Sequence, residues 1–202
     1  MKKKFYQVIK RILDVFFSII GIVLFIPFFL IIGIIIKIDS KGSIFYVHER
    51  VGKNDKKIKV IKFRTMYSNS DEIFNKMPEY KKKQYYTNYK IYDDERVTKF
   101  GKFLRKYYID EIPQLFNVLK GDMSIIGPRP IIYEETLKYG NNREKLLSVK
   151  PGITGYWQVN AYSEMRYDER IKNELFYVEN FSFKLDFIIF FRTIKKIFIH
   201  NN

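Results

Sequence analysis

Two adjacent carboxylates, Asp110 and Glu111, are the strongest candidates for catalytic residues in this sequence. They follow a basic run in 96–106 and precede Pro113. On a regular helix, neighbouring side chains point about 100° apart, so this pair shares a site only at a helix end or in a turn. Pro113 fits such a place, because proline is tolerated in the first turn of a helix. The alternative is an ordinary acidic helix N-terminus, favoured by the helix dipole.

Cations near this segment have spacings that suit phosphate binding. On an extended strand Lys62 and Arg64 would point to the same face, beside the hydroxyl of Thr65. Such a pair is suited to gripping a diphosphate, since arginine offers a bidentate fork. Arg129 lies between two prolines, which keep it off an ordinary helix. The alternatives are a routine surface pair and a plain loop arginine.

The composition indicates a membrane-associated or polyanion-binding protein. The chain has 202 residues, a formal net charge of +15 and 47% hydrophobic residues. Such a charge favours nucleic acid, an anionic membrane face or phosphorylated substrates as partner. The absence of cysteine excludes disulfides and thiolate metal sites, and two histidines, His48 and His200, argue against a histidine cluster or triad. A metal would therefore be held by carboxylates and phosphates, which suits Mg²⁺.

The N-terminal segment predicts a membrane anchor. Residues 15–36 contain no charge, and these 22 residues would form a helix of about 33 Å, close to the hydrocarbon thickness. Basic residues flank both ends of the run, so neither end is marked as the outer one. Pro27 lies near the middle, where it would kink a helix. This pattern fits two structures: a hairpin that enters and leaves one leaflet, and a single span with a tolerated proline.

The rest of the chain predicts a small, mostly helical domain of the α+β class with one β-hairpin. The hairpin strands are 44–47 and 58–63, around a turn at 52–55. Helices are predicted at 99–107, 113–119, 167–178 and 181–198, and a strand-like piece at 156–159. The polar 68–93 region is a solvated face, a mobile loop or a membrane-surface patch, of which we favour the first. The 181–199 segment, with Lys184, Arg192, Lys195 and Lys196, predicts an interfacial amphipathic helix, with a core helix as the alternative.

Taken together, these segments resemble the bacterial sugar transferase family, the monotopic phosphoglycosyl transferases that start glycan assembly on polyprenyl phosphate. The resemblance covers nearly the whole chain. It is carried by IDSKG at 38–42, ERVG at 49–52, KFRTM at 62–66, RVTKFG at 96–101, DEIPQLFNVLKGDMSIIGPRP at 110–130 and KPGITG at 150–155. Four positions depart from the family pattern: Ile26 replaces a serine, His48 a glutamine, Ala161-Tyr162 a Gly-Arg pair, and Glu174 an aspartate.

The resemblance implies a specific reaction. Members take a UDP-sugar and polyprenyl phosphate, make polyprenyl-diphosphate-sugar, release UMP and require Mg²⁺. Asp110 would be the nucleophile and a metal ligand, forming an acyl-phosphate, and Glu111 would support metal or proton handling. Lys62, Arg64 and Arg129 would offset charge on the phosphoryl oxygens. The resemblance also favours the one-leaflet hairpin over the span.

We therefore expect an anchor over residues 1–40, apolar over 12–36, and a cytoplasmic catalytic domain over 41–202 that ends in the interfacial helix. The expected location is the cytoplasmic face of the plasma (inner) membrane. The expected partners are a UDP-sugar, polyprenyl phosphate and anionic lipid, but not nucleic acid. The sequence leaves the sugar, the pathway and the oligomeric state open, a homodimer included. The rival interpretation is a non-catalytic basic membrane-binding protein, which leaves the Asp110-Glu111 segment unexplained.

Overall fold

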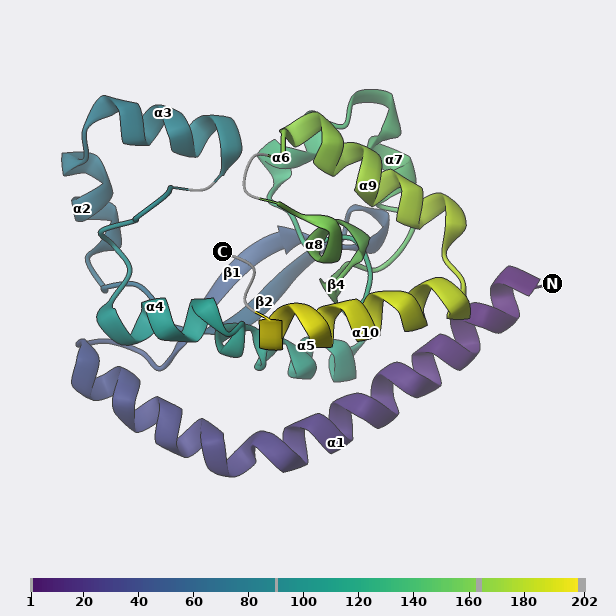
Figure 1. The fold of residues 1–202 in the computed structure, drawn as a ribbon, viewed down its shortest axis with the longest axis horizontal. Helices are drawn as coiled ribbons and strands as arrows, with labels where there is room; N and C mark the ends of the chain where they lie inside the picture. Colours follow the sequence, from purple (N-terminus) through teal and green to yellow (C-terminus); the bar gives the residue numbers. More distant parts are fainter. Residues whose placement is uncertain (1, 90, 163–164, 200–202) are drawn as a thin grey trace. The chain divides into compact units, whose positions relative to one another are not determined.

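The computed structural model describes residues 2–89, 91–162 and 165–199 (Figure 1). Packing divides the chain into two compact units. Unit 1 comprises residues 1–25, 47–61 and 113–202, and unit 2 comprises residues 26–46 and 62–112. His200, noted from the sequence, lies outside the described residues. The described residues are mostly helical, as predicted, and they also form small sheets.

The N-terminal helix α1 runs from Lys2 to Asp39 and includes Pro27. Among the described residues it is the helix that is long and apolar enough to cross a membrane, by length and composition. The predicted apolar anchor is thus helical along its whole length. Its path in a membrane, as a hairpin or as a span, stays a prediction.

The predicted hairpin is confirmed. Strands β1 (Phe45–Val51) and β2 (Lys57–Phe63) form a two-stranded sheet, joined by the 3-10 turn η1 (Lys53–Asp55). The backbone N–H of Gly52 donates to the carbonyl of Lys56 at 2.7 Å, which closes the turn.

Unit 1 contains a second sheet that the sequence did not predict. Its strands are β3 (Ser124–Ile126) and β4 (Gly152–Thr154), which pair in parallel with Ser124 opposite Gly152. The two backbones approach so closely that a Cβ on Gly152 would lie 2.1 Å from the nitrogen of Gly127. Glycine at positions 127 and 152 thus permits this contact. The other elements of unit 1 are α5 (Gln114–Lys120), α6 (Tyr133–Leu137), η3 (Gly140–Asn142), α7 (Arg143–Leu146), α8 (Tyr156–Asn160), α9 (Tyr167–Asn180) and α10 (Phe183–Ile199).

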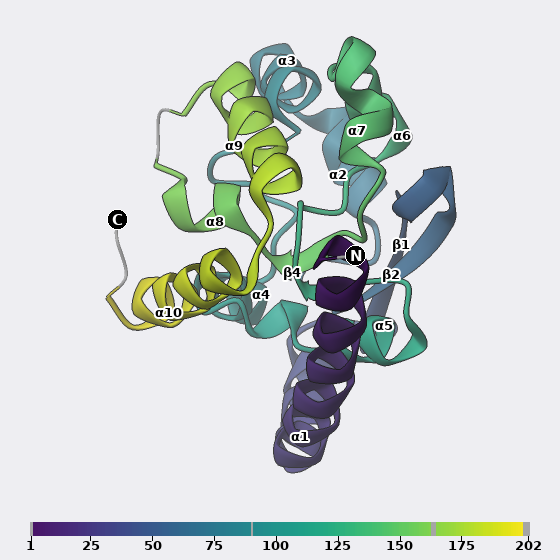
Figure 2. The same ribbon diagram turned by 90° about the vertical axis from the view of Figure 1, so that its right-hand side faces the viewer.

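The prediction of a strand at 156–159 is wrong, because these residues form helix α8. A helix places Tyr156 and Val159 on one face, and both pack against the core cluster of Ile126, Tyr177 and Ile189. Tertiary packing therefore overrides the β-preference of this aromatic segment. The predicted helices at 113–119, 167–178 and 181–198 correspond to α5, α9 and α10, the last two joined by a short connection (Figure 2).

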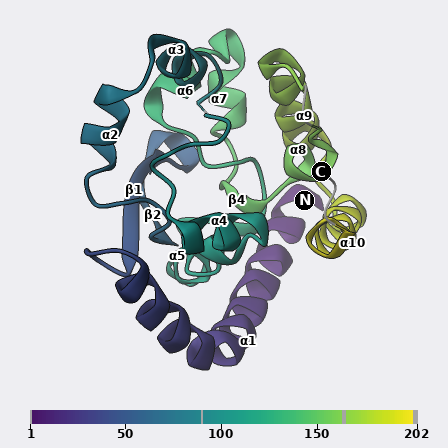
Figure 3. The same cartoon turned by 60° about the vertical axis from the view of Figure 1, so that its left-hand side comes forward.

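Unit 2 contains the end of α1 together with α2 (Ser70–Lys76), α3 (Glu79–Asn88), α4 (Lys99–Lys106) and the 3-10 turn η2 (Ile109–Glu111) (Figure 3). The predicted helix at 99–107 is confirmed as α4, where the Thr98 side chain caps the N-terminus by accepting from Gly101 N–H. The core of unit 2 is Ile36, Phe63 and Leu104, with Ile109 packed against it.

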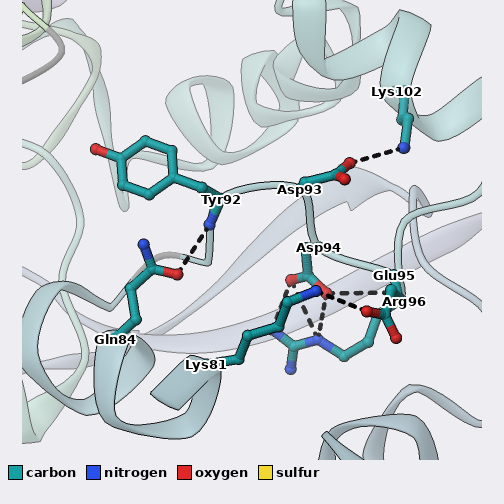
Figure 4. Close-up of polar contacts among 8 residues, drawn as sticks. All are labelled: Lys81, Gln84, Tyr92, Asp93, Asp94, Glu95, Arg96 and Lys102. Atoms are coloured by element: carbon teal, nitrogen blue, oxygen red, sulfur yellow. Dashed lines mark hydrogen bonds and ion pairs between the residues drawn. The ribbon is translucent and has the colours of Figure 1, made fainter. Parts of the chain in front are cut away.

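The polar 68–93 region is helical and carries many exposed side chains, as the favoured interpretation expected. Ion pairs attach it to α4 and to the segment before α4 (Figure 4). Lys81 Nζ lies 2.6 Å from Glu95 Oε1, and Lys102 Nζ lies 3.1 Å from Asp93 Oδ1. Such exposed pairs contribute little stability, because the solvent screens them.

Candidate active site

The two adjacent carboxylates lie on η2, between α4 and α5. This is the turn between helices in which neighbouring side chains can share a site, as expected from Pro113. Tyr108 begins the turn with a left-handed backbone, φ 59° and ψ 18°. A bulky residue in this conformation is strained, and such strain is concentrated at functional sites.

Lys62 from β2 reaches the carboxylate pair. Its Nζ lies 2.5 Å from Glu111 Oε1, and both side chains are largely buried. Asp110 is buried more deeply and is only 7% exposed. The structure thus brings three predicted site residues, Lys62, Asp110 and Glu111, into one cluster.

The environment makes Asp110 unusually basic for an aspartate. Burial raises the pKa of its carboxyl to about 6 from its ordinary value. The ammonium of Lys62 lowers this pKa, the neighbouring charge of Glu111 raises it, and Arg105 lowers it. Asp110 is therefore ionised in most molecules at neutral pH while it keeps a higher basicity than an exposed carboxylate.

Arg105 is a site residue that the sequence did not single out. It lies on α4, and its Nε donates to Thr65 Oγ1 at 2.8 Å. The sequence places Arg105 in a basic run without showing which member of that run faces the carboxylates. The sequence did contain a signal for this role. The predicted helix before the carboxylate pair has Arg105 in its last turn, next to that pair.

Arg64 has partners other than those expected for a diphosphate grip. It is buried, and its guanidinium donates to Ser43 O, to Ser40 Oγ at 2.6 Å and to Ser40 O at 2.8 Å. These groups lie just after the C-terminus of α1, so Arg64 fixes the exit of that helix in unit 2. Its proposed substrate contact stays a prediction.

Arg129 lies in unit 1, in the loop after β3. Its backbone N–H donates to the carboxylate of Glu174, with both oxygens at 3.2 Å. Its guanidinium carbon lies 5.7 Å from the ring of Trp157. The loop is therefore positioned by a buried carboxylate from α9, and Arg129 itself is partly exposed.

A buried network supports this loop. Glu174 is 1% exposed, and burial raises its pKa to about 7 against the opposing effect of Arg170. Arg170 Nη1 contacts Glu135 Oε2 at 3.1 Å and its guanidinium carbon lies 4.6 Å from the ring of Trp157. The sequence pointed to Glu174 only as a departure from the family pattern. The contacts assign it a positioning role beside Arg129.

The carboxylates fit a metal that arrives with its substrate. The part of the chain that the structure describes contains no group of three or more acidic, histidine or cysteine side chains able to hold a metal ion. Mg²⁺ commonly binds through one or two carboxylates together with substrate phosphates. Asp110 and Glu111 supply such a donor pair, so they fit Mg²⁺ bound together with a diphosphate.

The first half of α1 has two different faces within unit 1. Tyr6, Asp14, Ser18 and Ile22 are buried, and they recur at helical spacing. Tyr6 Oη and Lys10 Nζ contact Asp186 Oδ2 on α10 at 2.6 and 2.7 Å. The other face carries large exposed apolar side chains, namely Phe5, Val8, Ile12, Phe16 and Val23. This half of the helix therefore docks by one face and leaves an apolar face uncovered.

The chain belongs to the bacterial sugar transferase family, whose family model matches residues 5–200. It is 39% identical to the exopolysaccharide production protein ExoY of Sinorhizobium fredii, over 93% of this chain and 84% of that protein. It is 36% identical to the undecaprenyl-phosphate galactose phosphotransferase of Salmonella typhimurium, over 98% of this chain and 42% of that protein. It is 40% identical to an Aeromonas hydrophila protein, the UDP-N-acetylgalactosamine-undecaprenyl-phosphate N-acetylgalactosaminephosphotransferase, over 95% of this chain and 44% of that protein. The chain thus spans less than half the length of these two phosphotransferases.

Proposed function

We propose that this protein transfers a phospho-sugar from a UDP-sugar to polyprenyl phosphate, in the first membrane step of a bacterial surface glycan. The observation that carries the proposal is the buried Asp110, held beside the Glu111–Lys62 ion pair with its pKa raised to about 6. The printed names of the Salmonella and Aeromonas relatives support the substrate class.

The chemistry proceeds in two displacements. A carboxylate oxygen of Asp110 attacks the sugar-bearing phosphorus, a P–O bond to Asp110 forms, and the P–O bond to UMP breaks with its electron pair leaving on UMP. An oxygen of polyprenyl phosphate then attacks the same phosphorus and releases the Asp110 carboxylate. Covalent catalysis of this kind divides one difficult transfer into two easier ones.

The cations of the site have distinct parts in this proposal. Lys62 holds Glu111 in place and, with Arg105, favours the ionised form of Asp110. Arg129 offsets charge on the phosphoryl oxygens. Arg64 has the same predicted role, and it also fixes the C-terminal end of α1. Asp110 and Glu111 would hold Mg²⁺, which when bound supplies charge neutralisation at the diphosphate.

The membrane placement is part of the same proposal. The docked polar face and uncovered apolar face of the first half of α1 are typical of a helix that lies in the interface. Helix α10 likewise exposes Phe187, Phe190, Phe191 and Phe198. These faces support a monotopic anchor in one leaflet, with the catalytic residues on the cytoplasmic side. Anionic lipid and a homodimer remain proposals for partners, and nucleic acid is not among them.

The test uses the full chain in detergent with a panel of UDP-sugars. With Mg²⁺ and the correct donor, but without polyprenyl phosphate, we expect a burst of UMP and a phospho-sugar adduct on Asp110 by peptide mass spectrometry. The adduct should disappear when polyprenyl phosphate is added. Asp122→Asn is the matched control, since Asp122 pairs with Lys56 and Lys120 in unit 1. Intersecting double-reciprocal plots, with no UMP until lipid is present, would point to a ternary complex instead.

A further inference from the structure

Unit 1 contains a cavity that the proposed chemistry does not use. Its volume is about 180 Å³, and it is bounded by the polar face of α1, the turn η1, β3, the segment before β4 and the end of α9. It is smaller than the roughly 300–1,000 Å³ typical of pockets that enclose a whole small-molecule ligand. The space suits a single phosphate group with a few waters, each of which needs about 30 Å³.

Four cations line this cavity, and two of them are engaged elsewhere. Lys10 pairs with Asp186, and the Arg11 guanidinium donates to Val118 O at 2.5 Å and Leu119 O at 2.8 Å. The other two cations are Lys53 and Lys150. Within residues 2–89, 91–162 and 165–199, neither makes an ion pair with a carboxylate.

The cations are crowded. A Cβ on Gly121 would lie 3.5 Å from Arg11 Nη2 and 3.6 Å from Lys150 Nζ, so both cations border the same glycine. Burial and the charge of Arg11 lower the pKa of Lys150, against the opposing effect of the Asp14 carboxylate. Crowded like charges in a partly buried space favour the binding of an anion there.

The remaining polar groups of the cavity include one carboxylate and one hydroxyl. Asp14 also lines it, and its Oδ1 accepts the backbone N–H of Ile125 at 3.0 Å. The Ser124 hydroxyl is buried and, although it lies near Asp14, it has no hydrogen-bond partner of good geometry. It is therefore a donor available to a bound oxygen.

The position of the cavity indicates the source of the anion. A helix in the interface buries its apolar face at the boundary between headgroups and acyl chains, so its polar face lies at the level of the lipid phosphates. Residues of that polar face of α1, among them Lys10, Arg11 and Asp14, line the cavity. We infer that it binds the phosphate group of a membrane lipid, contacted by Lys53 and Lys150 with Ser124 as a further donor. This inference rests on the interfacial placement of α1 under the proposed function.

The test is lipid retention by the full chain in neutral maltoside micelles, measured by native mass spectrometry during titration. The probes are phosphatidylglycerol, undecaprenyl phosphate and, as the zwitterionic reference, phosphatidylcholine. We expect Lys53→Gln with Lys150→Gln to weaken retention of the anionic lipid about thirtyfold, since each cation near a lipid phosphate contributes on the order of a factor of five. Lys53→Arg with Lys150→Arg should retain it, which separates loss of charge from loss of fold.

Lys145→Gln with Lys172→Gln is the matched control, with the same change in net charge on unit 1 but outside the cavity. Retention of phosphatidylglycerol identifies a bulk phospholipid, and retention of undecaprenyl phosphate alone identifies the acceptor. Wild-type retention in the Gln variant, or equal competition by inorganic phosphate, would overturn the inference. The lipid-free UMP burst of the wild-type chain tests the transferase chemistry separately, because lipid retention stays measurable if that burst is absent.

Discussion

At the scale of single residues, the central feature is a carboxylate kept in a buried place where ionisation is costly. Asp110 is 7% exposed, and burial is the main cause of its raised pKa. Lys62 opposes that shift, so the site keeps Asp110 both basic and ionised. This combination suits a nucleophile better than a surface carboxylate, which is fully ionised but less basic.

We expect Asp110→Asn to abolish transfer, with a loss of at least about a thousandfold in kcat, because a nucleophile has no substitute. The same change should raise stability at pH 8 by up to about 3 kcal/mol. The raised folded-state pKa means that this group contributes most stability below its unfolded value near 3.8 and loses it as pH rises through about 6. Activity assays and thermal unfolding in detergent check both effects. Wild-type turnover by the Asn variant would exclude Asp110 as nucleophile.

The pH dependence of kcat/KM gives a second residue-scale prediction. The rate should fall as pH drops through about 6, because protonated Asp110 cannot attack. Lys62→Met should move this acidic limb to higher pH, since Lys62 lowers the pKa of Asp110. Glu111→Gln should move it to lower pH, since the charge of Glu111 raises that pKa. If neither variant shifts the acidic limb of the pH profile, the group that titrates there is not Asp110.

Sequence reasoning at this scale worked where neighbours along the chain decide the outcome. The adjacency of Asp110 and Glu111, followed by Pro113, indicated a turn before its geometry was known. The hydrogen-bond partners of Arg64 could not be predicted in this way. Period-two spacing predicts which face of a strand carries a side chain, but not where residues 40–43 lie. The role of Arg105 depends in the same way on packing.

At the scale of elements, one carboxylate gathers several of the contacts that attach the first half of α1 to the rest of unit 1. Asp186 on α10 accepts from Tyr6, Lys10 and Tyr177 at 2.6 to 2.8 Å. We expect Asp186→Ala to lower the free energy of unfolding by about 2–4 kcal/mol, because it leaves buried donors and an ammonium without a partner. Glu179→Ala removes the exposed pair with Lys145 and should cost about 0–1 kcal/mol. Similar melting temperatures for the two variants would show that the Asp186 cluster does not secure the helix.

The parallel pair of β3 and β4 gives another element-scale prediction. Gly152→Ala should destabilise unit 1 by about 3 kcal/mol or more, because the new methyl group would lie 2.1 Å from the backbone nitrogen of Gly127. Gly140→Ala is a control with open space around it, whose positive φ should cost only about 1 kcal/mol. Thermal unfolding compares the two variants. Equal losses of thermal stability in the two variants would show that the close contact between the two backbones is not needed for stability.

Elements with strong local signals were predicted well. Helix α4 has its Thr98 cap, and α5 has proline before it and glycine after it. The sheet of β3 and β4 was missed because each strand is three residues long and its partner lies far along the chain. Helix α8 was assigned as a strand for a related reason, since long-range packing of Tyr156 and Val159 decides its conformation.

At the scale of the whole molecule, the question is how the chain meets the membrane. We expect both ends of the 12–36 segment to face the cytoplasm. A cysteine that replaces Lys4 should resist a membrane-impermeant label added to intact cells, and a cysteine in the 41–202 domain should resist it equally. Pro27→Leu removes the residue that interrupts the helix hydrogen bonding and should favour a span. External labelling of the wild-type anchor at position 4 would establish a true span.

The attachment of α1 to unit 2 has a consequence for how the enzyme meets bilayers of different thickness. Phe29, Ile32 and Ile36 of the anchor pack in the same core as Ile109, the residue before Asp110. Arg64 holds the end of the helix to this core. In the proposed monotopic placement, the height of Asp110 above the acyl chains would therefore be set by side-chain packing and not by a tether. An anchor confined to one leaflet has no opposite surface to reach, so hydrophobic mismatch would not tilt it. Under the proposed one-leaflet anchor, the same chain would therefore work unchanged in thin and thick membranes, with Asp110 always at the depth of the lipid headgroups.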